Sequence, residues 1–168
     1  VQALRESGVF AMCTSAALGG RELTPLEQIE VVEVLAAADG AAGWCAMIGC
    51  DGGIASSYLD PSVARDLIPT VDDPCAFVAN PGGTAAPTAG GYRVSGQWAF
   101  ASGSSHAQAF FLNCLVVDDA GQMVAGPSGL PAMRVVGIPR DQVEVLDTWH
   151  TTGLAATASN DVKVTDPA

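Results

Sequence analysis

The stretch CAFVANPGGTAAPTAGGYRVSGQWAFASG, residues 75–103, decides the fold class of this 168-residue chain. Its two outer parts, residues 75–79 and 92–100, carry the apolar, aromatic and β-branched residues that are typical of strands. The run YRVS at residues 92–95 alternates as a half-buried antiparallel strand does. Residues 80–84, Asn-Pro-Gly-Gly-Thr, match neither of the common glycine-rich phosphate-binding loops, so their pattern predicts a turn.

Further strand-like runs follow this stretch, each bounded by glycine, proline or aspartate. They span residues 108–117, 133–138, 143–146 and 161–165. The sequence DDAG at residues 118–121 is typical of a hairpin turn. Short strands at this spacing favour an antiparallel β-barrel or sandwich.

Residues 24–38 give the clearest helix signal before the strands. Thr24 suits the N-cap, Pro25 suits the first helical position, and Glu27 completes a capping box. Four apolar residues at three-residue spacing then form one stripe: Leu26, Ile29, Val32 and Leu35.

Two more helices are predicted before the first strand. Residues 41–50 are too apolar for a surface helix, so we expect a buried helix anchored by Trp44. Asp60-Pro61 predicts a short helix over residues 62–68. Helices followed by strands, without regular βαβ alternation, indicate an α+β fold with a helical domain at 1–72 and a β-domain at 73–168.

The charge and hydropathy of the chain exclude two classes of partner. A formal net charge of -11 and the lack of a Lys/Arg cluster argue against nucleic acid. The chain shows no signal segment and no run of about twenty apolar residues, so neither secretion nor membrane spanning is expected. We therefore expect a cytoplasmic protein.

Cysteines and histidines give no metal or nucleophile motif. The five cysteines lack a CxxC pair and lie in apolar surroundings, which predicts free, buried thiols and no metal site. His106 and His150 have no partner motif, so we interpret both as surface or structural histidines. Neither is taken as a catalytic residue, and the catalytic residues stay unknown at this point.

Three segments, taken in order, carry a family resemblance. The first has two parts, LRESGVFAMCTSAALGG at residues 4–20 and AAADGAAGW at residues 36–44. The second is the stretch at residues 75–103, and the third is DTWHTTGLAATASNDV at residues 147–162. Together they resemble the helical and middle β-domains of the acyl-CoA dehydrogenase superfamily of flavoproteins, and in motif style its two-component flavin-dependent monooxygenases. The resemblance implies that the C-terminal helical bundle of such an enzyme is absent, so we expect a piece of a longer protein.

The third segment departs from the superfamily pattern. The superfamily commonly carries T-x-G-L-R-G-T-G-S there, whereas Ala155 and Ala156 replace the Arg-Gly pair and Ala158 replaces the last glycine. Any contact that the arginine makes in the superfamily is therefore missing from this chain.

The resemblance implies a bound flavin, FAD or FMN, held by two strand ends. The implied cofactor-binding residues are Val78, Ala79, Asn80, Phe100, Ala101 and Ser102. Ser102 is the candidate partner of flavin N5, because a hydroxyl can donate or accept a hydrogen bond as the flavin changes redox state. The alternative for Ser102 is a serine satisfied inside a turn. Trp98 and Phe100, two residues apart on a strand, are expected to share one face, against either the flavin or the core.

A flavin-dependent oxidoreductase is implied, with three alternatives for its activity. Thr84-Ala85-Ala86 stands where the dehydrogenases usually carry Gly-Ser-Asp, which favours a reduced-flavin monooxygenase, a hydroxylase component acting on a small-molecule substrate. Such a component receives FADH2 or FMNH2 from a separate flavin reductase. An FAD-dependent acyl-CoA dehydrogenase acting on a CH-CH bond is the second alternative, and a truncated binding or assembly module is the third. The resemblance also implies a homo-oligomer, a dimer or tetramer, at full length.

Overall fold

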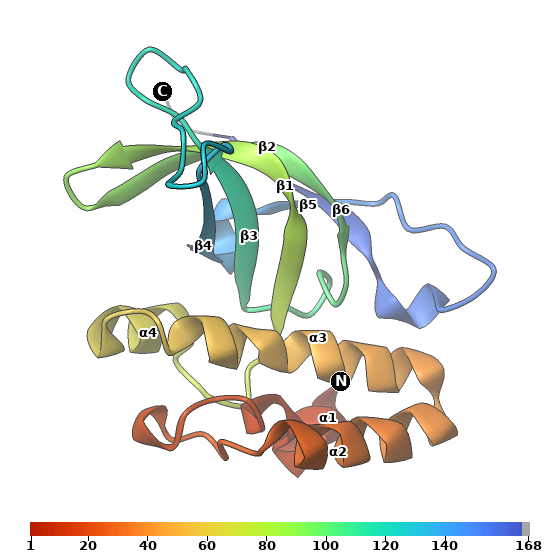
Figure 1. Ribbon diagram of the computed structural model, residues 1–168. Coiled ribbons are helices and arrows are strands. Elements are labelled where there is room, and N and C mark those ends of the chain that lie inside the picture. The colour runs from red at the N-terminus through yellow and green to blue at the C-terminus, as the bar shows by residue number, and fades with distance from the viewer. Residues whose placement is uncertain (166–168) are drawn as a thin grey trace.

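A helical layer lies beneath a single β-sheet in the computed structural model, which describes residues 1–165 (Figure 1). The α-helices are α1 (Gln2–Ser7), α2 (Pro25–Ala38), α3 (Gly40–Ser56) and α4 (Pro61–Leu67). Short 3-10 turns span Val9–Ala11, Ala16–Leu18, Arg140–Gln142 and Ala155–Thr157. Helix α3 runs between the sheet and the outer helices α1 and α2, so it is the element through which the two layers meet.

The sheet has six strands in the order β4-β3-β1-β2-β6-β5. The strands are β1 (Cys75–Thr88), β2 (Gly91–Ala101), β3 (Ala109–Val116), β4 (Met133–Pro139), β5 (Glu144–Leu146) and β6 (Asn160–Val164). All neighbours are antiparallel except β1 and β3, which are parallel. The α+β prediction is confirmed, but the antiparallel barrel or sandwich is not an exact description, because the six strands form one mixed sheet with a parallel β1–β3 pair. The short connection between Ala101 and Ala109 returns the chain after β2, so β3 runs opposite to β2 and parallel to β1. It pairs with the free edge of β1 because β6 occupies the outer edge of β2.

Strand β1 continues through residues 80–84, so the turn predicted there is wrong. The strand reverses only after Thr88, and its pairing with β3 shifts register between Val78 and Gly83. Pro81 lies inside this irregular stretch, where its missing N–H removes no regular ladder bond. The predicted turn is in fact a distortion within a longer strand.

Helix α2 begins as predicted, but its apolar stripe is only partly buried. The Thr24 hydroxyl accepts from the Glu27 amide, and the Glu27 carboxylate accepts from the Thr24 amide, which completes the capping box. Leu26 and Ile29 are 67% and 62% exposed. The stripe is split because α2 contacts its neighbours along one flank only, through Val31, Val32 and Leu35.

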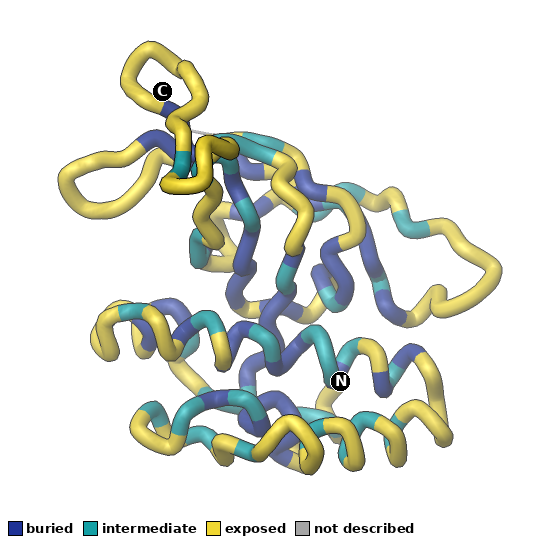
Figure 2. The backbone as a smooth tube through the Cα atoms, in the orientation of Figure 1, coloured by how far each residue is buried: buried dark blue, intermediate teal, exposed yellow. Residues whose placement is uncertain are grey.

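Helix α3 is buried as predicted and extends beyond the expected range to Ser56. Glycines allow its close approach to other elements. A Cβ at Gly49 would lie 2.6 Å from the Phe10 ring, and one at Gly52 would lie 2.5 Å from the Cys75 side chain. Buried residues accordingly gather along α3 and within the sheet, whereas the loops at the far side of the sheet are exposed (Figure 2).

The first helix is tied to the chain segment that precedes the sheet. Arg5 of α1 forms an ion pair with Asp73, whose side chain is 9% exposed. The pair joins the two sides of the predicted domain boundary at residues 72 and 73. The division into a helical domain and a β-domain stays a prediction, and residues 166–168 at the end of the second range lie outside the described residues.

The five cysteines are free thiols, and their environments differ. The Sγ atoms of Cys13 and Cys50 lie 3.1 Å apart, and the hydrogen bond between them lowers the pKa of Cys13. Burial raises the pKa of Cys75 to about 12 and that of Cys114 to about 11.

Cys13 is expected to be alkylated by iodoacetamide before Cys75 and Cys114 at pH 8, because the thiolate is the reactive form and Cys13 is only partly buried. Peptide mass spectrometry over a time course measures the order. Equal rates for the three thiols would contradict the buried placement of Cys75 and Cys114.

Candidate flavin site

The candidate flavin residues lie where two neighbouring strands lose their regular pairing. In β1 the register with β3 shifts after Val78, and Ala79 and Asn80 are exposed. In β2 the register with β6 shifts between Trp98 and Ala101. Irregular strand segments turn backbone groups away from the ladder, and they are common beside functional sites. Both strand segments of the predicted site are therefore irregular, with a shift in register next to the candidate residues.

Trp98 and Phe100 do not share a face, so that prediction is wrong. Trp98 is 1% exposed and its indole N–H donates to the carbonyl oxygen of Asn113 at 2.7 Å. Phe100 is 65% exposed and has a φ of 63°, a left-handed conformation that is uncommon outside glycine. The register shift rotates the strand between the two residues, which reverses the side of Phe100.

The exposed Phe100 ring is held from one side by Trp149. The two ring centroids lie 6.1 Å apart with an interplanar angle of 86°. Asn160 fixes the backbone of this partner, since its Oδ1 accepts from the amides of Thr148 and Trp149 at 3.2 and 3.0 Å. An exposed aromatic ring with an ordered neighbour provides a surface on which a planar ring system can pack.

Ser102 is buried, and its hydroxyl contacts two other side chains. The indole N–H of Trp44 donates to Ser102 Oγ at 2.8 Å, and Ser159 Oγ lies 2.8 Å from the same atom. The Ser102 amide also donates to the Phe100 carbonyl. The backbone of Ser102 is therefore satisfied inside a turn, as the alternative interpretation of this serine expected. Trp44 is 42% exposed rather than buried, and it anchors α3 through this hydrogen bond.

Sequence reasoning missed several residues around Ser102 and Phe100. They are Trp149, Thr157, Ser159 and Asn160, with Trp44 noticed only as a core residue. Part of the signal was present, because the third segment keeps the threonine and serine of the superfamily pattern at positions 157 and 159. Nothing local indicated that these hydroxyls meet Ser102, which lies 57 residues from Ser159.

Asn113 leaves a hydrogen-bond acceptor without a partner beside Ala79. Its side-chain N–H donates to the Ala79 carbonyl at 2.8 Å, while its Oδ1 is buried and unpaired. A buried acceptor without a partner costs stability, and an incoming N–H donor removes that cost. The N3–H group on the pyrimidine side of a flavin is such a donor. Together with the Phe100 ring and the Ser102 hydroxyl, this acceptor makes the residues present suited to a flavin.

A concavity of about 430 Å³ lies between α3 and the sheet, next to the β1 half of the site. Its lining is largely apolar and aromatic: Asp51, Ile54, Ala55, Tyr58, Leu59, Phe77, Phe111, Val135 and Gly137. Burial raises the pKa of Asp51 to about 6. The concavity is thus lined by the rings of Phe77 and Phe111 and by the carboxyl group of Asp51, whose pKa lies close to neutral pH.

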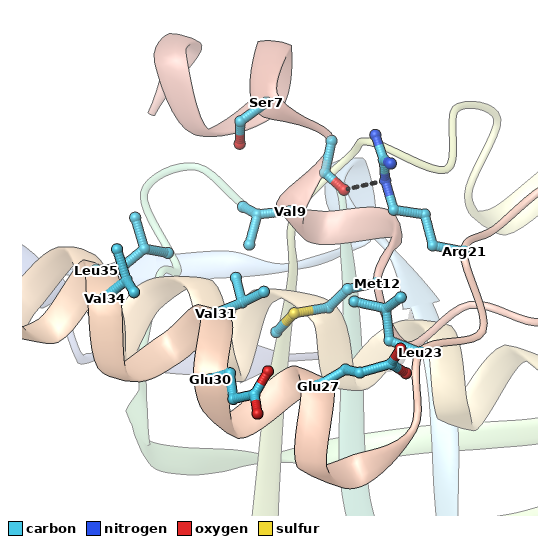
Figure 3. Close-up of a pocket in the computed structure, with 11 residues that line it drawn as sticks. Ser7, Val9, Met12, Arg21, Leu23, Glu27, Glu30, Val31, Val34 and Leu35 are labelled. Carbon is cyan, nitrogen blue, oxygen red and sulfur yellow. Dashed lines mark hydrogen bonds between the residues drawn. The ribbon is translucent and has the colours of Figure 1, made fainter.

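A second concavity, of about 650 Å³, lies on the outer side of the helical layer (Figure 3). Val9, Met12 and Val31 form its floor between the first helical segments and α2, and Arg21 is held by the Gly8 carbonyl at 3.2 Å. It contains none of the candidate flavin residues.

The histidines and the remaining polar clusters add nothing to the site. His106 and His150 are both exposed, and burial of part of the ring lowers the pKa of His106. Within residues 1–165 no group of three histidine, cysteine or acidic side chains is arranged to hold a metal ion. Over the same residues, none of the helices has both the length and the hydropathy needed to cross a bilayer.

The relatives found by comparison with known proteins are hydroxylases and monooxygenases. No family model matches the chain. A pigment production hydroxylase of Rhodococcus erythropolis is 34% identical over 167 residues, which are 97% of this chain and 41% of the relative. The oxygenase subunit HsaA of a flavin-dependent monooxygenase from Mycobacterium tuberculosis is 30% identical, over 99% of this chain and 40% of that subunit.

Solved structures agree with the sequence comparison. The structure of XiaF from a Streptomyces species, in complex with FADH2 and glycerol, superimposes with a TM-score of 0.87 at 26% identity. The match covers 99% of this chain and 40% of XiaF. The chain spans about two fifths of the length of the relatives it matches. Over nearly its whole length, the chain is therefore similar to flavin-dependent hydroxylases and monooxygenases.

Proposed function

We propose that this chain is part of the oxygenase component of a two-component, reduced-flavin monooxygenase of the acyl-CoA dehydrogenase superfamily. The observation that carries the proposal is the pair of irregular strand segments, one inside β1 after Val78 and one at the end of β2. They present exposed backbone at Ala79 and Asn80, an exposed ring at Phe100 and a buried hydroxyl at Ser102. The hydroxylase and monooxygenase relatives support the same reaction class.

Each candidate residue has one binding role in this proposal. When bound, FADH2 or FMNH2 supplies the electrons that activate oxygen. Backbone groups of Val78, Ala79 and Asn80 bind the pyrimidine side. The Phe100 ring packs against the ring system, the backbone of Ala101 lies beside it, and Ser102 Oγ holds the N5 position.

The concavity beside β1 is the proposed site of the small-molecule substrate. Phe77 directly precedes Val78 in β1, so the concavity lies one residue along the strand from the candidate flavin residues, although the Phe77 and Val78 side chains point to opposite faces. Phe77 and Phe111 suit an aromatic ring, and Asp51 can accept a hydrogen bond from a substrate hydroxyl. A largely apolar lining also excludes water from the reacting groups.

The proposal extends to partners and assembly. The relative HsaA is named as an oxygenase subunit, which supports a separate flavin reductase as the source of reduced flavin. We also propose that the full-length protein is a cytoplasmic homo-oligomer, a dimer or tetramer.

The dehydrogenase alternative has less support in the structure. Thr84, Ala85 and Ala86 are paired with β2, and Ala85 is completely buried. These residues therefore offer no exposed serine where an acyl-CoA thioester would be recognised. The alternative of a non-catalytic assembly module stays a hypothesis that flavin binding would remove.

Replacing Ser102 with alanine is expected to weaken binding of FADH2 by about threefold to tenfold, the effect of one lost hydrogen bond. Anaerobic titration of the full-length protein with FADH2 and FMNH2 measures the affinity. Ser105→Ala, in the adjacent exposed turn, is the matched control and is expected to bind flavin unchanged.

Admission of ¹⁸O₂ with a panel of small aromatic compounds then tests the reaction. A hydroxylated product carrying one ¹⁸O atom is expected. An unsaturated acyl-CoA formed without oxygen incorporation would establish the dehydrogenase instead, and absence of flavin binding would overturn both.

A further inference from the structure

Five residues from three parts of the chain form a continuous hydrogen-bond chain that ends at a backbone carbonyl. Trp44 Nε1 lies 2.8 Å from Ser102 Oγ, which lies 2.8 Å from Ser159 Oγ. Ser159 Oγ lies 2.7 Å from Thr157 Oγ1, and Thr157 Oγ1 lies 2.9 Å from the Leu154 carbonyl.

The direction of this chain follows from the number of protons. A carbonyl oxygen only accepts, so the single hydroxyl proton of Thr157 goes to Leu154. Thr157 must therefore accept from Ser159, and Ser159, having given its only proton, must accept from Ser102. The indole N–H of Trp44 only donates, so it completes the direction from the other end. Every hydroxyl proton in the chain points away from Ser102.

Burial protects this order from water. Ser102, Ser159 and Thr157 are 6%, 5% and 1% exposed. Reversing one hydroxyl inside such a chain leaves a buried donor or acceptor unpaired, which costs more than the hydrogen bond contributes when formed. The Leu154 carbonyl therefore fixes the orientation of a serine that lies more than fifty residues away in sequence.

We propose that this oriented chain makes Ser102 a hydrogen-bond acceptor toward flavin N5 and thereby selects the reduced cofactor. Ser102 Oγ has one proton, given to Ser159, and two lone pairs, of which Trp44 uses one. The remaining lone pair can accept from the N5–H of a reduced flavin. The N5 of an oxidised flavin has no proton and needs a donor, which Ser102 cannot provide without breaking its bond to Ser159.

The inference rests on the proposed flavin site and adds three positioning residues to it. Thr157 and Ser159 set the direction of the Ser102 hydroxyl, and Trp44 sets its location from α3. A monooxygenase that receives reduced flavin from a reductase needs this preference, because oxidised flavin occupying the site blocks the next turnover.

The test compares the affinities of the full-length protein for FAD and for FADH2, measured anaerobically and expressed as the ratio of the two dissociation constants. Thr157→Val keeps the side-chain shape but removes the acceptor of the Ser159 proton, so Ser159 turns to donate to Ser102 and the Ser102 proton becomes available to oxidised N5. We expect the preference for FADH2 to fall by about threefold to tenfold. Ser159→Ala, which frees the same proton, should lower the ratio similarly.

Two further variants distinguish the effect of the direction of the hydroxyl hydrogen bonds from a general structural effect of a substitution. Thr151→Val removes a hydroxyl from the same loop, where it bonds only to the Gly153 carbonyl, and should leave the ratio unchanged. Trp44→Phe removes a donor without reversing the chain, so both affinities should fall by the same factor. The ratio is independent of the fraction of folded protein, so partial unfolding of a variant does not obscure it.

The outcomes distinguish this inference from the proposed function. A protein that binds neither FAD nor FADH2 overturns the flavin site itself. A protein that binds FADH2, with the same ratio in the parent, Thr157→Val and Ser159→Ala, overturns the oriented chain and leaves the flavin site standing. A changed ratio in Trp44→Phe would assign the selection to the indole rather than to the hydroxyls.

Discussion

Replacing Gly83 with alanine is expected to destabilise the protein by about 3 kcal/mol, the upper part of the usual cost of overpacking. A Cβ at this position would lie 2.5 Å from the Trp98 ring and 2.5 Å from the Ser95 carbonyl oxygen. Neither neighbour can move easily, because the Trp98 indole is buried and bonded to Asn113 and the Ser95 carbonyl belongs to the paired strand β2. Chemical denaturation measured by tryptophan fluorescence gives the free energy of unfolding.

The matched control for this change is Gly90→Ala in the turn between β1 and β2. A Cβ at Gly90 would meet nothing within 4 Å, so a change of less than about 0.5 kcal/mol is expected. Equal effects at the two positions would contradict the placement of Trp98 across β1. Because Trp98 lies against Gly82 and Gly83, next to the irregular segment of β1, Gly83→Ala should also weaken flavin binding.

Replacing Asp51 with asparagine is expected to stabilise the protein by about 1–2 kcal/mol at pH 7, after allowance for the solvent-exposed part of the side chain. Burial raises the folded-state pKa of Asp51 from 3.8 to about 6, so the folded protein binds this proton more tightly than the unfolded chain. The charged carboxylate consequently lowers stability, with the cost absent below about pH 4 and complete above about pH 6. Asparagine keeps the shape and removes the charge.

Denaturation of the parent and of Asp51→Asn at pH 4 and pH 7 measures this effect. The two proteins should be equally stable at pH 4 and should differ at pH 7. Asp119→Asn, in the exposed turn at residues 118–121, is the control and should change stability by less than about 0.5 kcal/mol at either pH. A destabilised Asp51→Asn variant at pH 7 would show that the carboxylate has a partner that compensates for its burial.

Local patterns predicted the elements that depend on neighbouring residues. The capping box at Thr24 and Glu27 predicted the start of α2, alternation indicated β2, and apolar runs bounded by turn residues indicated the strands after it. The hairpin turn at 118–121 also forms, with the Asp118 carboxylate accepting from the amides of Ala120 and Gln122. Each of these features depends on a few residues that are close together in the chain, so it can be predicted from the sequence alone.

The features that were missed depend on contacts between distant residues. The glycines at 82 and 83 suggested a turn, but their reason is the Trp98 ring that crosses β1 from the next strand. Phe100 changes side because β2 pairs with β6, about sixty residues later. The contact of Trp44 with Ser102 joins residues 58 positions apart, and no local pattern indicates it.

The most direct test of the central claim is hydrogen–deuterium exchange of the full-length protein with and without FADH2 under anaerobic conditions. Bound flavin is expected to slow exchange in the peptides covering residues 75–82 and 98–104, while residues 118–130 exchange as before. Saturating FADH2 that leaves both peptides unprotected, or that instead protects the concavity with Val9, Met12 and Val31 at its floor, would contradict the assignment of the flavin site to the irregular segments of β1 and β2.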